Sequence, residues 1–138
     1  MDYLYKYECK TRVRYGETDQ MGIVYYGNYA EYYEIGRVET LRSLGIRYRD
    51  IEEVHRIVMP VVHMEVRYLR PARYDELLTI NTYVLKLDEK YIYFYSELFN
   101  EEHQFLNMSR IKLCFVDHGT LKRVSAPELL INKLNTLV

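Results

Sequence analysis

The chain has 138 residues, a formal net charge of −1, and a composition in which 49% of residues are hydrophobic and 28% are charged. This length and composition predict one globular domain, residues 1–138, that buries about two thirds of the surface of its unfolded chain. Lys and Arg form no basic run, and no apolar run approaches the roughly 20 residues of a membrane span, which argues against a nucleic-acid-binding protein and a transmembrane protein.

The N-terminal part predicts a strand and then a turn. Side chains alternate between apolar and polar over residues 7–15, as in a half-buried strand. Residues 16–22 are rich in turn-forming residues and are followed at once by the apolar run Ile23–Tyr26. An apolar surface is therefore expected directly after the turn.

A long helix is predicted next. Asn28 is a favourable N-cap, Glu31 three residues later completes a capping-box pattern, and Gly45 is a natural helix stop. Ile35 and Val38 fall on the side of the helix that carries most of its charges, so the helix is expected to be covered on more than one face. One face is expected to combine Tyr29, Tyr33, Gly36, Thr40 and Leu44.

Four strands are predicted after the helix, because the side-chain period changes from helical to two after Pro60. Short loops between long strands favour an antiparallel meander. The predicted strands cover residues 62–68, 77–87, 91–99 and 105–116, with turns at 88–90 and 100–104.

The chain is predicted to end in a short helix. Ser125 and Glu128 have capping-box spacing, and Pro127 is expected in the first turn. One long helix with five long antiparallel strands predicts an α+β domain in which the sheet curls around the helix and buries it.

Several kinds of chemistry are disfavoured by the spacing of reactive residues. The four histidines have no ligand-like spacing with one another or with the cysteines, so no metal is expected. There is no G-x-S-x-G motif, no G-x-G-x-x-G motif and no P-loop, so no nucleotide cofactor is expected. Cys9 and Cys114 form no C-x-x-C and no signal peptide is visible, which favours the reducing cytoplasm.

Asp19 is the main candidate for a catalytic group, with two interpretations. Aspartate favours turns because its side chain bonds nearby backbone, and that alone explains its position. Alternatively, a carboxylate just before a helix start lies near unpaired N–H donors that suit a developing oxyanion, which is the minimum equipment for acyl-bond cleavage. The spacing alone leaves both interpretations open.

The segment "DQMGIVYYGNYAEYYEIGRVETLRSLG" resembles hotdog-fold acyl-CoA thioesterases, in particular the 4-hydroxybenzoyl-CoA thioesterase branch and the enzymes associated with the Tol–Pal cluster. The shared pattern is an aspartate, a glycine three residues on, an apolar-aromatic run and a tyrosine on the opening helix. Asp19, Gly22, the run Ile23–Tyr26 and Tyr29 occupy these positions. The segments "VRYLRPARYDELL" and "LCFVD" are also similar to strands of the family, so the resemblance spans nearly the whole chain.

The resemblance implies a hotdog fold and specific roles. Asp19 is the implied catalytic carboxylate, as nucleophile or as general base for water, and the backbone N–H of Tyr26 is implied to polarise the thioester carbonyl. Tol–Pal-associated members commonly carry a histidine where this chain has Tyr26, which leaves no neutral-pH base beside the carboxylate. The sequence does not decide between the two mechanisms. Residues expected at the substrate are Gly22, Ile23, Val24, Tyr29 and Tyr91.

Three sets of side chains, some of them among these predicted contacts, each have two alternative roles. Tyr29 either lines the substrate pocket or packs on the core-facing side of the helix. Tyr91, with Tyr93 and Tyr95 on the same strand face, either lines an acyl pocket or stacks across a subunit interface. Basic residues that either contact coenzyme A phosphates or form a solvated rim are Arg67, Arg70, Arg73 and Lys90.

The function implied is hydrolysis of an acyl-CoA thioester to a free acid and coenzyme A, without a metal or redox cofactor. A non-catalytic module that only binds acyl-CoA is the alternative, and the carrier is either coenzyme A or acyl carrier protein. A hydratase of the same fold is disfavoured because no histidine precedes His55. A homodimer or homotetramer is implied by the resemblance, and the acyl group is left open.

Overall fold

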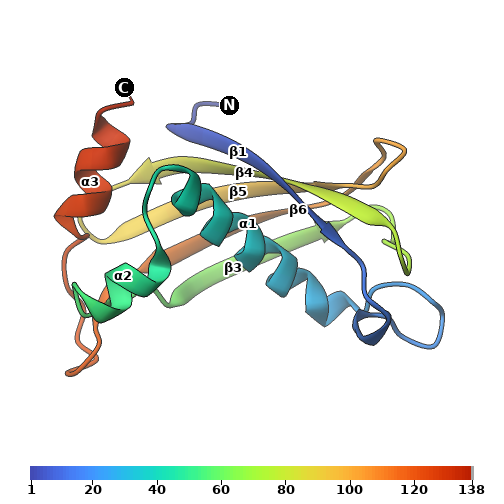
Figure 1. Cartoon of the computed structure of the whole chain (residues 1–138), viewed down its shortest axis with the longest axis horizontal. Coiled ribbons are helices and arrows are strands. Elements are labelled where there is room, and N and C mark those ends of the chain that lie inside the picture. Colours follow the sequence, from blue (N-terminus) through green and yellow to red (C-terminus); the bar gives the residue numbers. More distant parts are fainter. Residues whose placement is uncertain (138) are drawn as a thin grey trace.

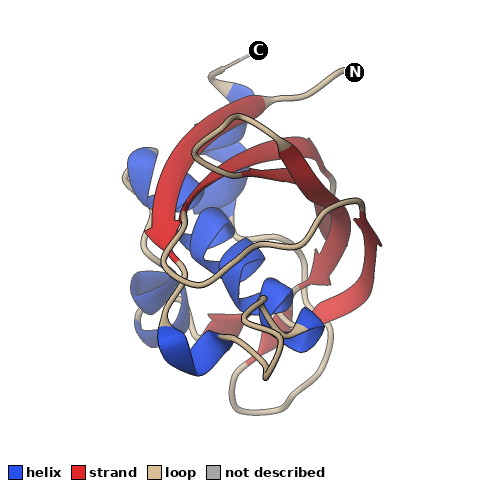
Figure 2. Ribbon diagram, turned by 90° about the vertical axis from the view of Figure 1, so that its right-hand side faces the viewer, coloured by secondary structure: helices blue, strands red, loops and turns tan. Residues whose placement is uncertain are grey.

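Five strands form one antiparallel sheet in the order β1-β4-β5-β6-β3. A computed structural model describes residues 1–137; Val138, the last residue of the predicted domain, lies outside them. Helix α1 lies along the inner side of the curved sheet, and α3 lies near the chain ends (Figures 1 and 2). The strands are β1 Tyr5–Arg12, β3 Val61–Tyr68, β4 Leu77–Leu87, β5 Tyr91–Phe99 and β6 Phe105–Cys114, and the helices are α1 Tyr29–Ser43 and α3 Glu128–Asn135. The predicted α+β fold, a five-stranded sheet around one long helix, is confirmed.

Shorter elements complete the chain. Helix α2 (Tyr48–Glu53) follows α1, and β2 (Ile57–Val58) pairs with β7 (Val116–Asp117) in a separate ribbon. Neither α2 nor β2 was predicted from the sequence. Two 3₁₀ turns, Tyr15–Glu17 and Tyr26–Asn28, flank the segment that carries Asp19.

The inner face of the sheet is buried because side chains of alternate residues point toward α1. In β4 the even-numbered residues from Leu78 to Val84 are fully buried, while the odd-numbered ones are half-buried. Tyr91, Tyr93 and Tyr95 occupy odd positions of β5, whereas the inward Ile92 and Phe94 join the core. The three tyrosines therefore lie on the outer face, away from α1.

Helix α1 is covered on more than one side, as predicted. Tyr29, Tyr33, Gly36 and Thr40 of the predicted stripe are buried, and Leu44 is half-buried. Side chains outside that stripe are buried as well: Tyr32, Arg37 and Leu41. Much of the contact is with β1 and β4, on the side where Gly36 permits a close approach.

Both predicted capping boxes are wrong. Asn28 follows a 3₁₀ turn and already has helical torsions (φ −82°, ψ −12°), so its side chain does not cap α1. Its amide Nδ2 instead donates to the carbonyl oxygen of Glu17 at 2.9 Å. At the C-terminal helix, Pro127 takes the cap position and Glu128 is the first helical residue, which leaves Ser125 too far upstream to cap.

Gly36→Ala is expected to destabilise the fold. An added Cβ would lie 2.5 Å from Thr82 Oγ1 and 2.8 Å from Ile80 Cγ2, and both neighbours are β-branched and stiff. Overpacking costs about 1–3 kcal/mol and outweighs the gain of about 1 kcal/mol in helix propensity, so urea unfolding should show a net loss of about 1–2 kcal/mol. Gly16→Ala is the control, because nothing lies within 4 Å of its added Cβ. Equal stability of the Gly36 variant and the wild type would contradict the close packing.

Candidate active site

Asp19 lies at the tip of a small hairpin. Its backbone N–H donates to the carbonyl of Ile23 at 2.9 Å, and the N–H of Gly22 donates to the carbonyl of Asp19 at 3.0 Å. One residue farther along, Thr18 and Val24 form an antiparallel bridge. Gly22 has φ +77°, a conformation that side-chain-bearing residues rarely adopt, which is the physical reason for glycine three residues after the aspartate.

The carboxylate of Asp19 is fixed by one oxygen. Oδ1 accepts the backbone N–H of Met21 at 2.8 Å, while Oδ2 has no hydrogen-bond partner within residues 1–137. The side chain is half-buried, and none of the ion pairs among these residues involves it. One oxygen is therefore oriented by the turn and the other is available to a substrate or a water molecule.

The start of α1 supplies unpaired donors. Tyr25 donates its N–H to Glu17, and Asn28 donates its N–H to Tyr25. In the part of the chain that the structure describes, the N–H groups of Tyr26 and Gly27 have no acceptor. The N–H groups that open a helix carry partial positive charge, so these two amides suit an oxygen that becomes negative during a reaction.

An apolar pocket of about 260 Å³ adjoins these donors. Three of its side chains, Ile23, Val24 and Tyr29, are predicted substrate contacts, and Tyr26 is the predicted donor. The rings of Tyr29 and Tyr68 lie 5.6 Å apart between their centroids. Arg70, predicted either to contact coenzyme A phosphates or to form a solvated rim, also lines this pocket. The other residues of the lining were missed from the sequence, because they come from the end of β3 and the loop after it: Tyr68, Leu69 and Pro71.

Tyr29 packs in the core and also lines the apolar pocket, while its contact with a substrate stays a prediction. The N–H of Ala72 donates to the Tyr29 hydroxyl at 3.1 Å, and the carbonyl of Ala72 accepts the N–H of Val24 at 2.8 Å. Burial raises the pKa of Tyr29, the bond from Ala72 opposes that rise, and the charge of Asp19 adds to it. The hydroxyl thus stays protonated and ties the helix start to the hairpin and to the loop after β3.

Tyr91 lies away from this group, at the other end of the sheet. The apolar pocket lies near the C-terminal end of β5. Arg70 and Pro71 line both this pocket and a second hollow, and that hollow is also lined by Asn100, the residue after the end of β5. Tyr91 is the first residue of that strand, and the 9 residues of β5 span roughly 27 Å. Within one chain, Tyr91 therefore cannot share an acyl pocket with Asp19.

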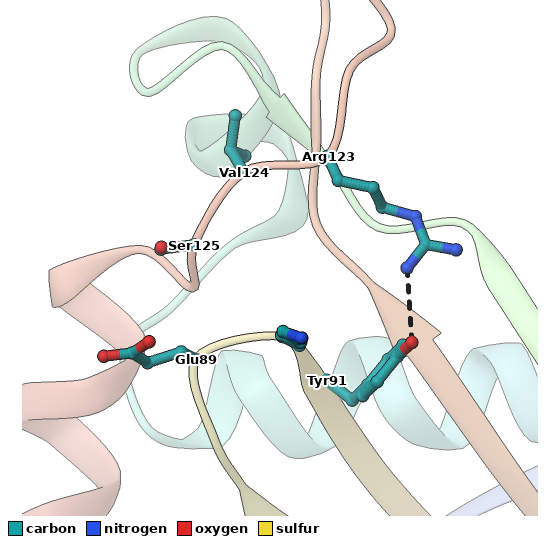
Figure 3. Close-up of a pocket in the computed structure, with 6 residues that line it drawn as sticks. Glu89, Tyr91, Arg123, Val124 and Ser125 are labelled. Carbon is teal, nitrogen blue, oxygen red and sulfur yellow. Dashed lines mark hydrogen bonds between the residues drawn. The ribbon is translucent and has the colours of Figure 1, made fainter.

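Tyr91 instead belongs to a basic pocket of about 410 Å³, which is lined by two cations, Lys90 and Arg123, and one carboxylate, Glu89. Arg123 points toward Tyr91 and donates to its hydroxyl at 3.4 Å (Figure 3). The ammonium of Lys112 lies 4.5 Å from the centre of the Tyr91 ring, and Lys90 lines the same pocket. An aromatic face surrounded by cations suits a planar, negatively charged ligand.

Within residues 1–137, no group of three or more His, Cys, Asp or Glu side chains lies close enough together to hold a metal ion. No helix in this part of the chain is both long and apolar enough to cross a membrane.

Comparisons with known proteins agree on one family. A family model described as the thioesterase-like superfamily matches residues 13–134. YbgC of Escherichia coli, named an acyl-CoA thioester hydrolase, is 30% identical over 120 residues, which are 87% of this chain and 89% of that protein. YneP of Bacillus subtilis is 42% identical over 72 residues, 52% of this chain and 51% of that protein, so the match spans about half its length. The structure of a DHNA-CoA thioesterase from Staphylococcus aureus matches with a TM-score of 0.91 at 27% identity, covering 96% of this chain and 90% of that chain.

Proposed function

This chain belongs to the thioesterase-like superfamily, with the hotdog fold, and on that basis we propose that it hydrolyses an acyl-CoA thioester to a free acid and coenzyme A. One observation carries the proposal. A half-buried carboxylate with a free oxygen, Asp19, shares a loop with the free N–H groups of Tyr26 and Gly27, and Tyr26 lines an apolar pocket at the end of that loop. Each part of a thioester has a complementary group there.

The apolar pocket receives the acyl group, and the amides receive the carbonyl oxygen. As the carbonyl carbon becomes tetrahedral, its oxygen gains negative charge. The N–H of Tyr26 stabilises this charged oxygen more strongly than it stabilises the neutral carbonyl oxygen of the bound thioester. The partial positive charge of the helix start acts in the same direction. The aromatic walls, Tyr29 and Tyr68, limit access of water to the acyl group.

Asp19 acts on the carbonyl carbon by one of two routes. In the nucleophilic route Oδ2 adds to the carbon, the C–S bond breaks with release of the thiolate, and water then hydrolyses the mixed anhydride. In the general-base route Oδ2 takes a proton from water while that water adds to the carbon, and the thiolate leaves from the tetrahedral adduct. Single turnover in ¹⁸O-labelled water separates them, since the anhydride route alone can place label in Asp19.

Asp19→Asn is expected to lower kcat about 100-fold or more, because the amide keeps the shape and the bond from Met21 but lacks the negative charge. The measurement is thiol release from a panel of acyl-CoA thioesters, with unfolding followed in parallel. Asp75→Asn, at an exposed carboxylate outside the pocket, is the control. Near wild-type rates for Asp19→Asn across the panel would contradict the catalytic role of Asp19. Tight binding of acyl-CoA by the wild type without thiol release would instead identify a non-catalytic acyl-CoA-binding module.

A homodimer formed through β3 supports this site. β3 is an edge strand of 8 residues, and Val61, Val62 and Tyr68 on it are exposed. Long apolar edges pair readily with another strand. Two-fold antiparallel pairing places the Val61 end of one β3 beside the Tyr68 end of the other, next to the apolar pocket. The second copy then covers the pocket that one chain leaves open.

Val62→Lys is expected to weaken the dimer, because it places charge in the paired edge. Sedimentation velocity should show a dimer for the wild type and an increased monomer fraction for the variant, with a matching loss of thiol release. Val54→Lys, at a residue that is 70% exposed after α2, is the matched control. A monomeric wild type at micromolar concentration would contradict the dimer.

The basic pocket at Tyr91 is proposed to bind the nucleotide of coenzyme A. In the dimer, β5 of the second copy lies three strands beyond the first copy's β3, or about 14 Å across the sheet. Within the second copy, Tyr91 pairs with Cys114, and the N–H of Cys114 donates to the carbonyl of Pro60, just before β3. Tyr91 of the second copy is therefore level with the Val61 end of its own β3. In the dimer that end lies beside the Tyr68 end of the first copy's β3. The pantetheine arm of coenzyme A separates the thioester from the phosphates. A ligand of this shape suits two separated subsites, the apolar pocket for the acyl group and the basic pocket for the nucleotide.

Arg123→Met is expected to raise KM for acyl-CoA about 10-fold and leave kcat within about 3-fold, because it removes charge that contacts phosphate in ground and transition states alike. KM for an acyl-pantetheine, which lacks the nucleotide, should not change. Lys122→Met, the neighbouring residue outside the pocket, is the control. An equal rise in KM for acyl-CoA and for the acyl-pantetheine in Arg123→Met would contradict nucleotide binding in this pocket. A preference of the wild type for acyl carrier protein thioesters would identify the protein-bound carrier as the substrate.

A further inference from the structure

Glu17, two residues before Asp19, has hydrogen bonds to both sides of the candidate site. Its carboxylate oxygen Oε1 accepts the backbone N–H of Arg14 at 2.8 Å and the hydroxyl of Tyr32 at 2.8 Å. Its carbonyl oxygen accepts the N–H of Tyr25 at 3.0 Å and the side-chain amide of Asn28 at 2.9 Å. One residue therefore bonds to the chain before the Asp19 hairpin, to the chain after it and to α1.

These four bonds fix the two catalytic elements relative to each other. Arg14 and Tyr25 lie before and after the hairpin that carries Asp19, and Tyr25 immediately precedes the proposed oxyanion donor, Tyr26. Tyr32 is fully buried in the first turn of α1, so the carboxylate of Glu17 is attached to a rigid part of the core. Together with the backbone bonds of the hairpin and of Ala72, the Glu17 carboxylate thus restrains the separation between the Asp19 carboxylate and the Tyr26 amide.

The chemistry of the Tyr32 contact favours a carboxylate acceptor. Burial raises the pKa of the Tyr32 hydroxyl, and the bond to Glu17 raises it further, so the hydroxyl remains a donor at neutral pH. A hydroxyl that donates to an ionised acceptor makes a stronger bond than one that donates to a neutral group. Glu17 does not line the apolar pocket, so it does not itself contact the acyl group.

We infer that Glu17 is a positioning residue, which holds Asp19 at the distance from the Tyr26 amide that thioester hydrolysis requires. This inference rests on the proposed thioesterase function. Catalysis by a carboxylate and a preformed donor is sensitive to displacements of about 1 Å, which lower rates on the order of 100-fold. No local pattern in the sequence predicts a role in the site for Glu17, Tyr32 or the side chain of Asn28.

The test compares Glu17→Ala, Glu17→Gln and Tyr32→Phe. Glu17→Ala is expected to lower kcat about 10- to 100-fold with KM within about 3-fold, because the pocket stays while the geometry relaxes. Glu17→Gln should restore kcat to within about 3-fold of the wild type, since one amide oxygen can accept both bonds that Oε1 accepts. Tyr32→Phe should fall between the two, and it keeps the test available should Glu17→Ala not fold.

Asp117→Ala is the control, because its carboxylate likewise accepts two hydrogen bonds, from the backbone N–H groups of Gly119 and Thr120, in a turn beyond the end of β6. It should lower Tm as Glu17→Ala does without lowering kcat. In an Asp19→Asn background, Glu17→Ala should cause no further loss, since there is no longer a carboxylate to position. Amide hydrogen exchange of residues 19–27, which does not depend on activity, should be faster in Glu17→Ala and unchanged in Glu17→Gln.

Three kinetic outcomes would overturn the inference: wild-type kcat in folded Glu17→Ala, an equal loss of kcat in Asp117→Ala, or independent effects of Glu17→Ala and Asp19→Asn. A fourth outcome, unchanged hydrogen exchange in Glu17→Ala, would overturn it as well. Failure of the proposed function would look different. The wild type would then release no thiol, while amide hydrogen exchange of residues 19–27 would still be faster in Glu17→Ala.

Discussion

The site depends on a short chain of hydrogen bonds through Ala72. The N–H of Ala72 donates to the Tyr29 hydroxyl, and its carbonyl accepts the N–H of Val24, so the loop after β3, the first residue of α1 and the Asp19 hairpin are held as one unit. Buried backbone groups rarely go unpaired, because an unmade bond costs about 1–3 kcal/mol. The helix start therefore cannot move relative to the hairpin without breaking bonds in the core.

The rest of the fold keeps this unit at the end of the sheet. Gly36 lets α1 approach β4, which fixes the position of the helix, while the 3₁₀ turn at Tyr26–Asn28 leaves two N–H groups without acceptors in the described chain. A side-chain cap at Asn28 would have bonded N–H groups farther into α1, those of Ala30 or Glu31, and would have left both of these donors free as well.

The sequence predicts the fold well because its signals are local. Period-two alternation located the long strands, and the glycine after Leu44 marked the end of α1. The Asp19–Gly22 spacing likewise predicted a turn, which the positive φ of Gly22 explains.

Apart from the two capping boxes, what the sequence did not show is long-range geometry. Tyr91 was grouped with Asp19, although the length of β5 separates them, and Tyr68 was missed because strand pairing brings it to the pocket. Nothing in the local pattern around Glu17 indicates that its carboxylate reaches the buried hydroxyl of Tyr32, 15 residues on.

The most direct measurement is a crystal structure with an acyl-CoA analogue in which a methylene separates the carbonyl from sulfur, so that no hydrolysis occurs. The carbonyl oxygen should lie about 3 Å from the N–H nitrogen of Tyr26, with its carbon about 3–3.5 Å from Asp19 Oδ2. A carbonyl that binds elsewhere, with Asp19 turned to solvent or paired with a cation, would contradict the account.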